Sequence, residues 1–308
     1  ILHRLVGSEM CIRDRNTPML FALGFIGMFV IGGLSGVTHS VVPADTQQTD
    51  TYYIVAHFHY VLFGGALFGI FSGLYFWFPK VWGKMYNETM GKIHFWLMII
   101  GFNLTFGPMH WLGLQGQVRR TWVYAEETNL GFWNLIVTIG AFILAVATLV
   151  FMANWMYSRR KGEVAPFDPW DARTIEWSIP SPTPVWNFSK APEVKSLDDF
   201  WHQKYGEDED GRALKREGTD ELLAQLEDEG LNPKEEIHLP SPSYFPIIMA
   251  FGLPFIGYAV IYKSIPLALI GVILLLIGGF GWGTEPLEEE FESSEEEKPY
   301  MEKPQNYE

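Results

Sequence analysis

Cysteine is almost absent from this chain of 308 residues, which contains only Cys11. One cysteine cannot form a disulfide framework within the chain or a metal site built from several thiolates. Any redox chemistry would therefore depend on histidine or on bound cofactors. Positive charge is also scarce, because 22 lysine and arginine residues stand against 36 aspartate and glutamate residues, a net charge of −14. We expect no nucleic-acid partner for so acidic a chain.

Charge is missing from several long stretches of the sequence. The hydrophobic set makes up 48% of the residues and aromatics 16%, yet the mean hydropathy is only +0.07. This average combines uncharged apolar runs with an acidic polar part, which is typical of a membrane protein with polar extensions. The predicted fold class is all-α: a polytopic transmembrane helix bundle of about six transmembrane helices with a polar cytoplasmic linker.

The apolar runs have the length of about 20 residues that a helix needs to cross a bilayer. The predicted spans are residues 18–42, 51–78, 93–112, 132–156, 244–262 and 265–282. Gly107-Pro108 should kink the third span or end its regular part. Residues 43–50 and 80–92 are predicted to be loops, and the last two spans form a tight hairpin.

The spans divide the chain into five segments. Residues 1–16 lack the layout of a signal peptide, and we interpret them as a non-native leader. Residues 17–161 carry four spans, 162–242 form the linker, 243–283 the hairpin, and 284–308 an acidic tail for which disorder is expected. The prolines and tryptophans of the linker predict an extended strap on the membrane part. Leucines at positions 222, 223 and 226 predict one or two short surface helices between residues 196 and 229.

Basic residues predict the orientation of the spans. Lys80, Lys84 and Lys92 follow the second span, and Arg159, Arg160 and Lys161 end the fourth. By the positive-inside rule, both groups face the cytoplasm. The start of the second span therefore faces outward, and the linker and tail are cytoplasmic.

Two histidines lie close together in the second span, within Thr51-Tyr-Tyr-Ile-Val-Ala-His-Phe-His-Tyr60. On an α-helix each residue advances the side chain by about 100°, so His57 and His59 point about 200° apart and cannot share one ion. They face different neighbours. As ligands they would serve two centres, and as core residues they would be hydrogen bonded; the spacing leaves both interpretations open.

The same stretch resembles the heme-copper oxidases, in particular subunit I of bacterial cytochrome c oxidases. The matching words begin at Asp50-Thr-Tyr-Tyr and continue with Lys92-Ile-His-Phe95, Gly101-Phe-Asn-Leu-Thr-Phe106 and Gly116-Gln-Val-Arg-Arg120. The resemblance covers about residues 17–160, the last third of that subunit. The hairpin resembles a small two-helix, subunit-IV-like chain, through the word Pro240-Ser-Pro-Ser-Tyr244.

The resemblance implies two hemes of the A type. His57 would bind the iron of the high-spin heme that faces copper, and His59 would be one of two axial ligands of the low-spin heme. Arg119 and Arg120 would bind heme propionates, since arginine pairs with carboxylates through a fixed fork of donors.

Two carboxylates of the loop before the second span also match the family. Asp50 would help to hold a magnesium ion, but the histidine that usually precedes it is Thr49 here, which weakens this site. Asp45 matches a proton-loading position, and an ordinary loop aspartate is the alternative. The remaining histidines of the spans, His39, His94 and His110, are interpreted as structural or interfacial.

The implied activity is reduction of O2 to water with electrons from cytochrome c, coupled to proton pumping in a bacterial cell membrane. Partners would be oxidase subunits II and III, cytochrome c, O2 and the lipid bilayer. The family's copper ligands are not among these residues, so the chain alone is expected to be inactive. A quinol-oxidising member of the family and a non-catalytic heme-binding membrane subunit are the alternatives.

Overall fold

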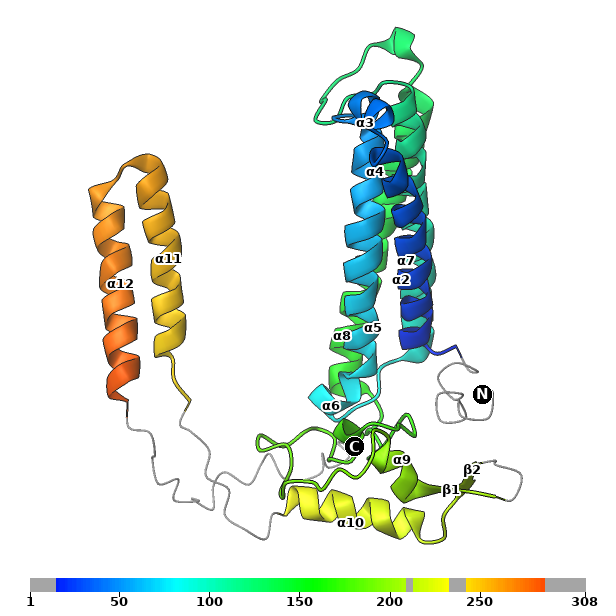
Figure 1. The fold of residues 1–308 in the computed structure, drawn as a ribbon, viewed down its shortest axis with the longest axis vertical. Helices are drawn as coiled ribbons and strands as arrows, with labels where there is room; N and C mark the ends of the chain where they lie inside the picture. Colours follow the sequence, from blue (N-terminus) through cyan, green and yellow to red (C-terminus); the bar gives the residue numbers. More distant parts are fainter. Residues whose placement is uncertain (1–14, 209–212, 233–241, 286–308) are drawn as a thin grey trace. The chain divides into compact units, whose positions relative to one another are not determined.

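The computed structural model describes residues 15–208, 213–232 and 242–285 (Figure 1). Most of the predicted leader and nearly all of the predicted acidic tail therefore lie outside the described residues. The chain divides into two compact units, residues 1–232 and 233–308. Each unit is described by itself.

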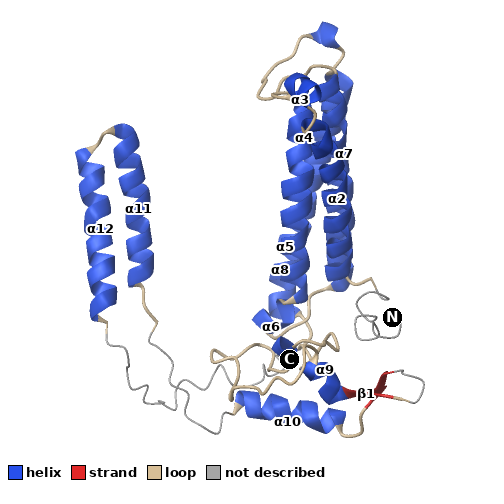
Figure 2. Ribbon diagram, viewed as in Figure 1, coloured by secondary structure: helices blue, strands red, loops and turns tan. Residues whose placement is uncertain are grey.

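Within the described residues, six helical segments are long and apolar enough to cross a membrane. In the first unit they are α2 (Thr17–His39), the segment Tyr52–Phe76, α7 (Glu88–Leu114) and α8 (Gly131–Lys161); in the second they are α11 (Phe245–Tyr262) and α12 (Ile265–Thr284). The described strands are two short ones, β1 (Tyr205–Glu207) and β2 (Ala213–Lys215), which pair antiparallel (Figure 2). The fold class predicted from the sequence, an all-α multi-pass membrane protein, is confirmed.

The second span is not one regular α-helix. It consists of α4 (Tyr52–Val61), a π-helical segment η2 (Leu62–Leu67) and α5 (Phe68–Phe76). Gly64 and Gly65 lie in η2, and a Cβ on Gly64 would approach the Cβ of Met28 in α2 to 2.7 Å. The π-helical segment therefore begins three residues after His59 and contains a point where the span closely approaches α2.

Two predicted loops contain short helices. Residues 42–48 form α3 (Val42–Gln48), which has a proline in its first turn and Asp45 near its N-terminus, where a negative charge is favourable. Residues 78–82 form α6 (Phe78–Trp82). Such short helices lack the long apolar pattern that identifies a span.

Helix α7 begins earlier than predicted and continues past Pro108. The Asn87 side chain accepts a hydrogen bond from the backbone N–H of Met90 at 2.9 Å and so caps the helix. Beyond Pro108, the helix runs to Leu114. Helices in apolar surroundings tolerate proline when neighbouring helices hold them, and α7 packs on both α4 and α8.

Aromatic rings fill the space between α2, α5 and α7. Phe21, Phe68 and Phe102 are fully buried there. The ring of Phe21 lies 5.6 Å from that of Phe68, and Phe68 lies 5.9 Å from Phe102. Aromatic pairs of this kind add about 0.5–1.5 kcal/mol each beyond the burial of their surface. These contacts therefore hold α2 and α7 at a fixed separation from the α5 part of the second span.

The first part of the linker is more compact than the extended strap predicted from its prolines. Trp177, in the 3-10 turn η4 (Ile175–Trp177), is fully buried, and Trp170 donates its indole N–H to the carbonyl of Phe76 at 3.0 Å. Lys80 Nζ donates to the carbonyls of Ile179 and Pro180. This part of the chain therefore packs on the ends of α5 and α6.

A buried charge cluster joins the later part of the linker to its beginning. Lys204, at the end of α9 (Asp199–Lys204), is 1% exposed and lies 2.5 Å from Asp168 and 2.8 Å from Asp171. It also donates to the carbonyl of Ala172 at 2.8 Å. Beyond β2, α10 (Thr219–Leu231) contains the leucines that predicted a surface helix.

The hairpin α11–α12 packs through glycines. A Cβ on Gly252 would lie 2.7 Å from the carbonyl oxygen of Gly271, and one on Gly278 would lie 2.6 Å from the backbone nitrogen of Met249. The two backbones therefore approach more closely than larger residues allow. Only Lys263 and Ser264 separate the helices, as the sequence predicted, and Lys263 adopts the left-handed conformation with φ 49°.

Candidate functional site

The site lies at the end of the first unit that carries α3, where the loop between α7 and α8 arches over the helix ends (Figure 1). Helix α4 begins there and is capped by Thr51, whose hydroxyl accepts a hydrogen bond from the N–H of Tyr53 at 3.2 Å. The backbone joins the loop to α4, because the N–H of Tyr52 donates to the carbonyl of Gln117 at 2.9 Å. The start of α4 is therefore fixed to the segment that carries Arg119 and Arg120.

Helices α4 and α7 touch backbone to backbone near this end. A Cβ on Gly113 would lie 2.1 Å from the nitrogen of Tyr53, so only glycine fits at this position. This contact sets the separation of α4 and α7 about one turn before His57.

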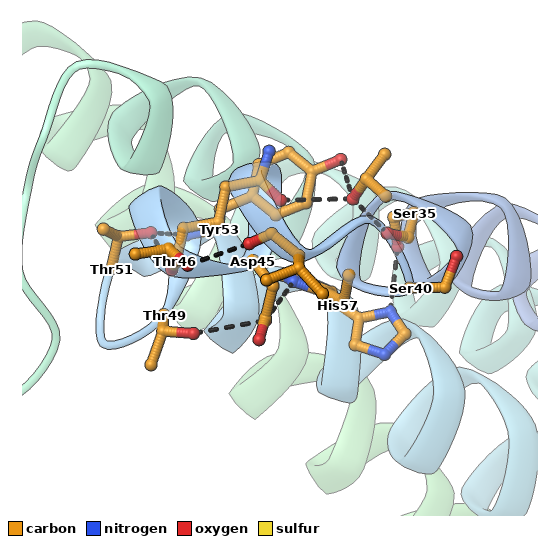
Figure 3. A network of polar contacts seen from close by, with 12 residues as sticks. Ser35, Ser40, Asp45, Thr46, Thr49, Thr51, Tyr53 and His57 are labelled. Carbon is orange, nitrogen blue, oxygen red and sulfur yellow. Dashed lines mark hydrogen bonds and ion pairs between the residues drawn. The ribbon is translucent and has the colours of Figure 1, made fainter.

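His57 faces α2. Its Nδ1 lies 2.9 Å from the carbonyl oxygen of Gly32 and 3.0 Å from Oγ of Ser35 (Figure 3). A carbonyl oxygen can only accept, so Nδ1 carries the proton and the lone pair is on Nε2. A Cβ on Gly36 would lie 2.7 Å from Cε1 of this ring, so glycine makes the space for the imidazole.

His59 faces α7. Its Nδ1 lies 2.7 Å from the carbonyl oxygen of Val55, which again places the lone pair on Nε2. Its ring stacks on that of Phe106, with centroids 4.1 Å apart and planes 14° apart. The opposite directions predicted for the two histidines from helix geometry are therefore observed.

Both imidazoles have the arrangement of metal-ligating histidines. Such residues donate the N–H of one ring nitrogen to a carbonyl or carboxylate and present the lone pair of the other. Among the described residues, no polar group hydrogen-bonds to Nε2 of His57 or His59. The two imidazoles therefore fit the role of axial ligands to a heme iron, one on each side of α4.

The loop carboxylates have other partners. Asp50, in the left-handed conformation with φ 63°, forms an ion pair with Arg119, and its carbonyl accepts the N–H of Arg119 at 2.8 Å. Asp45 accepts a hydrogen bond from the Thr49 hydroxyl at 3.2 Å. Arg120 is exposed, and no described carboxylate lies within ion-pair distance of it. The structure thus pairs Asp50 with Arg119, and among the described residues neither Asp45 nor Arg120 forms an ion pair with either of them.

The other histidines of the spans have local contacts. His94 is fully buried, with Nδ1 3.1 Å from the hydroxyl of Tyr75. His110 Nδ1 lies 3.3 Å from the carbonyl of Gly107, and His39 Nδ1 lies 3.3 Å from the Asp45 carboxylate without hydrogen-bond geometry. Within the described ranges, no group of three or more histidine, cysteine, aspartate or glutamate residues is arranged to hold a metal ion.

Four residues of the site were not identified from the sequence: Gly32, Ser35, Gly36 and Phe106. A polar Ser35 within a glycine-rich apolar span was the available signal for a partner of His57.

Comparison with known proteins gives consistent results. The family model for cytochrome c and quinol oxidase polypeptide I matches residues 8–143, a match that begins within the segment interpreted as a leader. Cytochrome c oxidase subunit 1 of Alkalihalophilus pseudofirmus is 41% identical over 265 residues, which is 86% of this chain and 40% of that protein. The same subunit of a Synechocystis species is 51% identical over 177 residues, 58% of this chain and 32% of that protein.

A quinol oxidase subunit 1 from Bacillus subtilis is 38% identical over 266 residues, 85% of this chain and 38% of that protein. The chain thus spans about 40% of the length of these relatives or less. The match to the Alkalihalophilus protein covers 86% of the 308 residues, so it leaves too few residues unmatched at either end to miss the histidine stretch or the linker. The sequence matches and the helical membrane fold together place this chain in the family of cytochrome c and quinol oxidase polypeptide I.

Proposed function

We propose that this chain is part of the catalytic subunit of a terminal respiratory oxidase that reduces O2 to water with electrons from cytochrome c and pumps protons. The observation that carries the proposal is the pair of imidazoles on α4. Each presents an Nε2 lone pair, one toward the α2 side and one toward the α7 side. Bound heme would supply electron transfer and the iron at which O2 reacts.

His57 would ligate the high-spin heme and His59 the low-spin heme, both of the A type. The contacts to Gly32, Ser35 and Val55 keep the two rings in the tautomer that binds iron. Each heme would receive one ligand from this chain. The copper ligands and the second axial ligand of the low-spin heme would come from other parts of the subunit, so these residues alone would be inactive.

Arg119 and Arg120 would bind the heme propionates. The exposed Arg120 is free to do so directly, whereas Arg119 would hold a propionate while remaining paired with Asp50. Asp50 would contribute to a magnesium site that Thr49 weakens, because threonine lacks the imidazole of the family's usual ligand. Asp45 would hold a proton close to the propionates.

The protein would lie in the bacterial cell membrane, with the heme-ligand end toward the outer face and the linker and tail in the cytoplasm. Lys84 and the basic end of α8 support this orientation, because they lie at the end of the bundle opposite the histidines. Oxidase subunits II and III and cytochrome c would be the partners.

Optical spectra of membranes that contain the assembled oxidase test this proposal. His57→Ala should remove the high-spin heme signal and keep the low-spin one, and His59→Ala should do the reverse. His94→Ala is the matched control, because His94 is a buried histidine with no contact to α4 and should leave both signals. If both signals persist in both α4 variants, the ligand assignment is wrong.

A quinol donor is the second candidate, supported by the 38% identical quinol oxidase and by Thr49. Oxygen uptake by the assembled enzyme with reduced cytochrome c and with a quinol decides between the two donors. Uptake with the quinol alone would refute the cytochrome c assignment and leave the heme ligands unaffected.

A further inference from the structure

The stacking of His59 on Phe106 is the closest ring contact of either α4 histidine to another helix. The centroids are 4.1 Å apart and the planes 14° apart. His57, by contrast, has a tilted contact with His39, at 5.1 Å and 56°, and polar contacts to Gly32 and Ser35. Of the two imidazoles, His59 is therefore the one with a stacked ring from another helix.

Phe106 is itself fixed in place. It is 8% exposed and lies 5.0 Å from the ring of Phe102 and 6.1 Å from that of Phe63. Helix α7 continues without a break through Phe106 and Pro108, and the close contact of Gly113 with Tyr53 fixes its distance from α4. The ring face of Phe106 therefore provides a rigid platform beside α4.

Two contacts together define the plane of the His59 ring. The hydrogen bond from Nδ1 to Val55, at 2.7 Å, fixes one edge, and the Phe106 ring covers one face. An imidazole that binds iron through Nε2 is otherwise free to turn about the bond to the metal. Groups behind a metal ligand commonly set its orientation.

We propose that Phe106 is a positioning residue that sets the plane of the His59 imidazole about the axis of the low-spin heme. This proposal rests on the proposed function, because it requires His59 to be an axial ligand. The orientation of an axial imidazole determines how the iron orbitals split, and electron paramagnetic resonance of the oxidised low-spin heme reports that splitting directly.

The test is the electron paramagnetic resonance spectrum of the assembled oxidase with Phe106→Leu. Loss of the aromatic face should shift the largest g-value of the low-spin signal by more than the wild-type line width and broaden it, while heme content stays unchanged. Phe106→Met should give the same shift, and it serves as the second variant where Phe106→Leu fails to assemble. Phe106→Tyr keeps the aromatic face and should restore the wild-type signal.

Phe95→Leu is the matched control. Phe95 is also a buried phenylalanine of α7, 4% exposed, and its described ring contacts are with Phe21 and Trp96. Equal g-values in Phe106→Leu and Phe95→Leu would overturn the positioning role. A low-spin signal that survives His59→Ala would instead refute the proposed function, so the two failures are distinguishable.

Discussion

Gly36 offers a sharp test of how His57 is held. In Gly36→Ala the new Cβ would lie 2.7 Å from Cε1 of His57, whereas ordinary contacts begin at 3.4 Å. The imidazole or the helix must therefore move by about 0.7 Å. The ring has little freedom to move, because its Nδ1 is bound at 2.9 Å to Gly32 and at 3.0 Å to Ser35.

The magnitude follows from these contacts. A displacement of about 0.7 Å would lengthen the Nδ1 contacts to roughly 3.6 Å, beyond the range of a hydrogen bond. Overpacking of this kind costs about 1–3 kcal/mol. A loss of about 2 kcal/mol would weaken the binding of the heme proposed for His57 by about 30-fold.

The assay is the heme content and the high-spin optical signal of the assembled oxidase. Gly33→Ala is the matched control, since it adds the same methyl group to the same helix, where no atom lies within 4 Å. We expect Gly36→Ala to lose the high-spin signal and Gly33→Ala to keep it. Equal signals in both variants would refute the reasoning that α2 holds the His57 ring.

Two further predictions concern the linker. Burial lowers the pKa of Lys80 from 10.5 to about 8. Between these two pH values the folded state has lost the proton of Lys80 and the unfolded state still binds it. The free energy of unfolding should therefore rise with pH across this range, by up to about 3 kcal/mol. Thermal unfolding followed by the fluorescence of the buried tryptophans measures this gain, and an equal rise in Lys80→Met would contradict the assignment. Lys204→Met leaves the buried Asp168 without its cation and should cost about 3–5 kcal/mol in the same assay. Lys215→Met removes an exposed ion pair and should change stability little, so equal losses in the two variants would contradict the role of burial.

The spans and the divergence of the two histidines were predictable, because both depend on regularities within one helix. The length of an apolar run identifies a span, and the 100° advance per residue separates His57 from His59. The partners of these rings lie elsewhere: Ser35 and Gly32 precede His57 by 22 and 25 residues. Packing between the helices decides which turn of α2 lies against which turn of α4. No pattern within either helix predicts that alignment.

The compact linker was missed for a similar reason. Its prolines indicate extended backbone, and the backbone between its short helices is irregular. The burial of Trp177 and the pairing of Lys204 depend on contacts with α6 and with residues more than 30 positions away. A charge that would be solvated in an isolated peptide is buried here because its counter-charges are supplied by another segment.

The seam of glycines between α11 and α12 has a consequence for biosynthesis. Because these helices bury their own contact surface and are joined by only two residues, they are suited to enter the bilayer together as a pair. A pair that enters together returns the chain to the side from which it came. Such a hairpin therefore adds two crossings to a membrane protein and leaves the sidedness of everything before and after it unchanged.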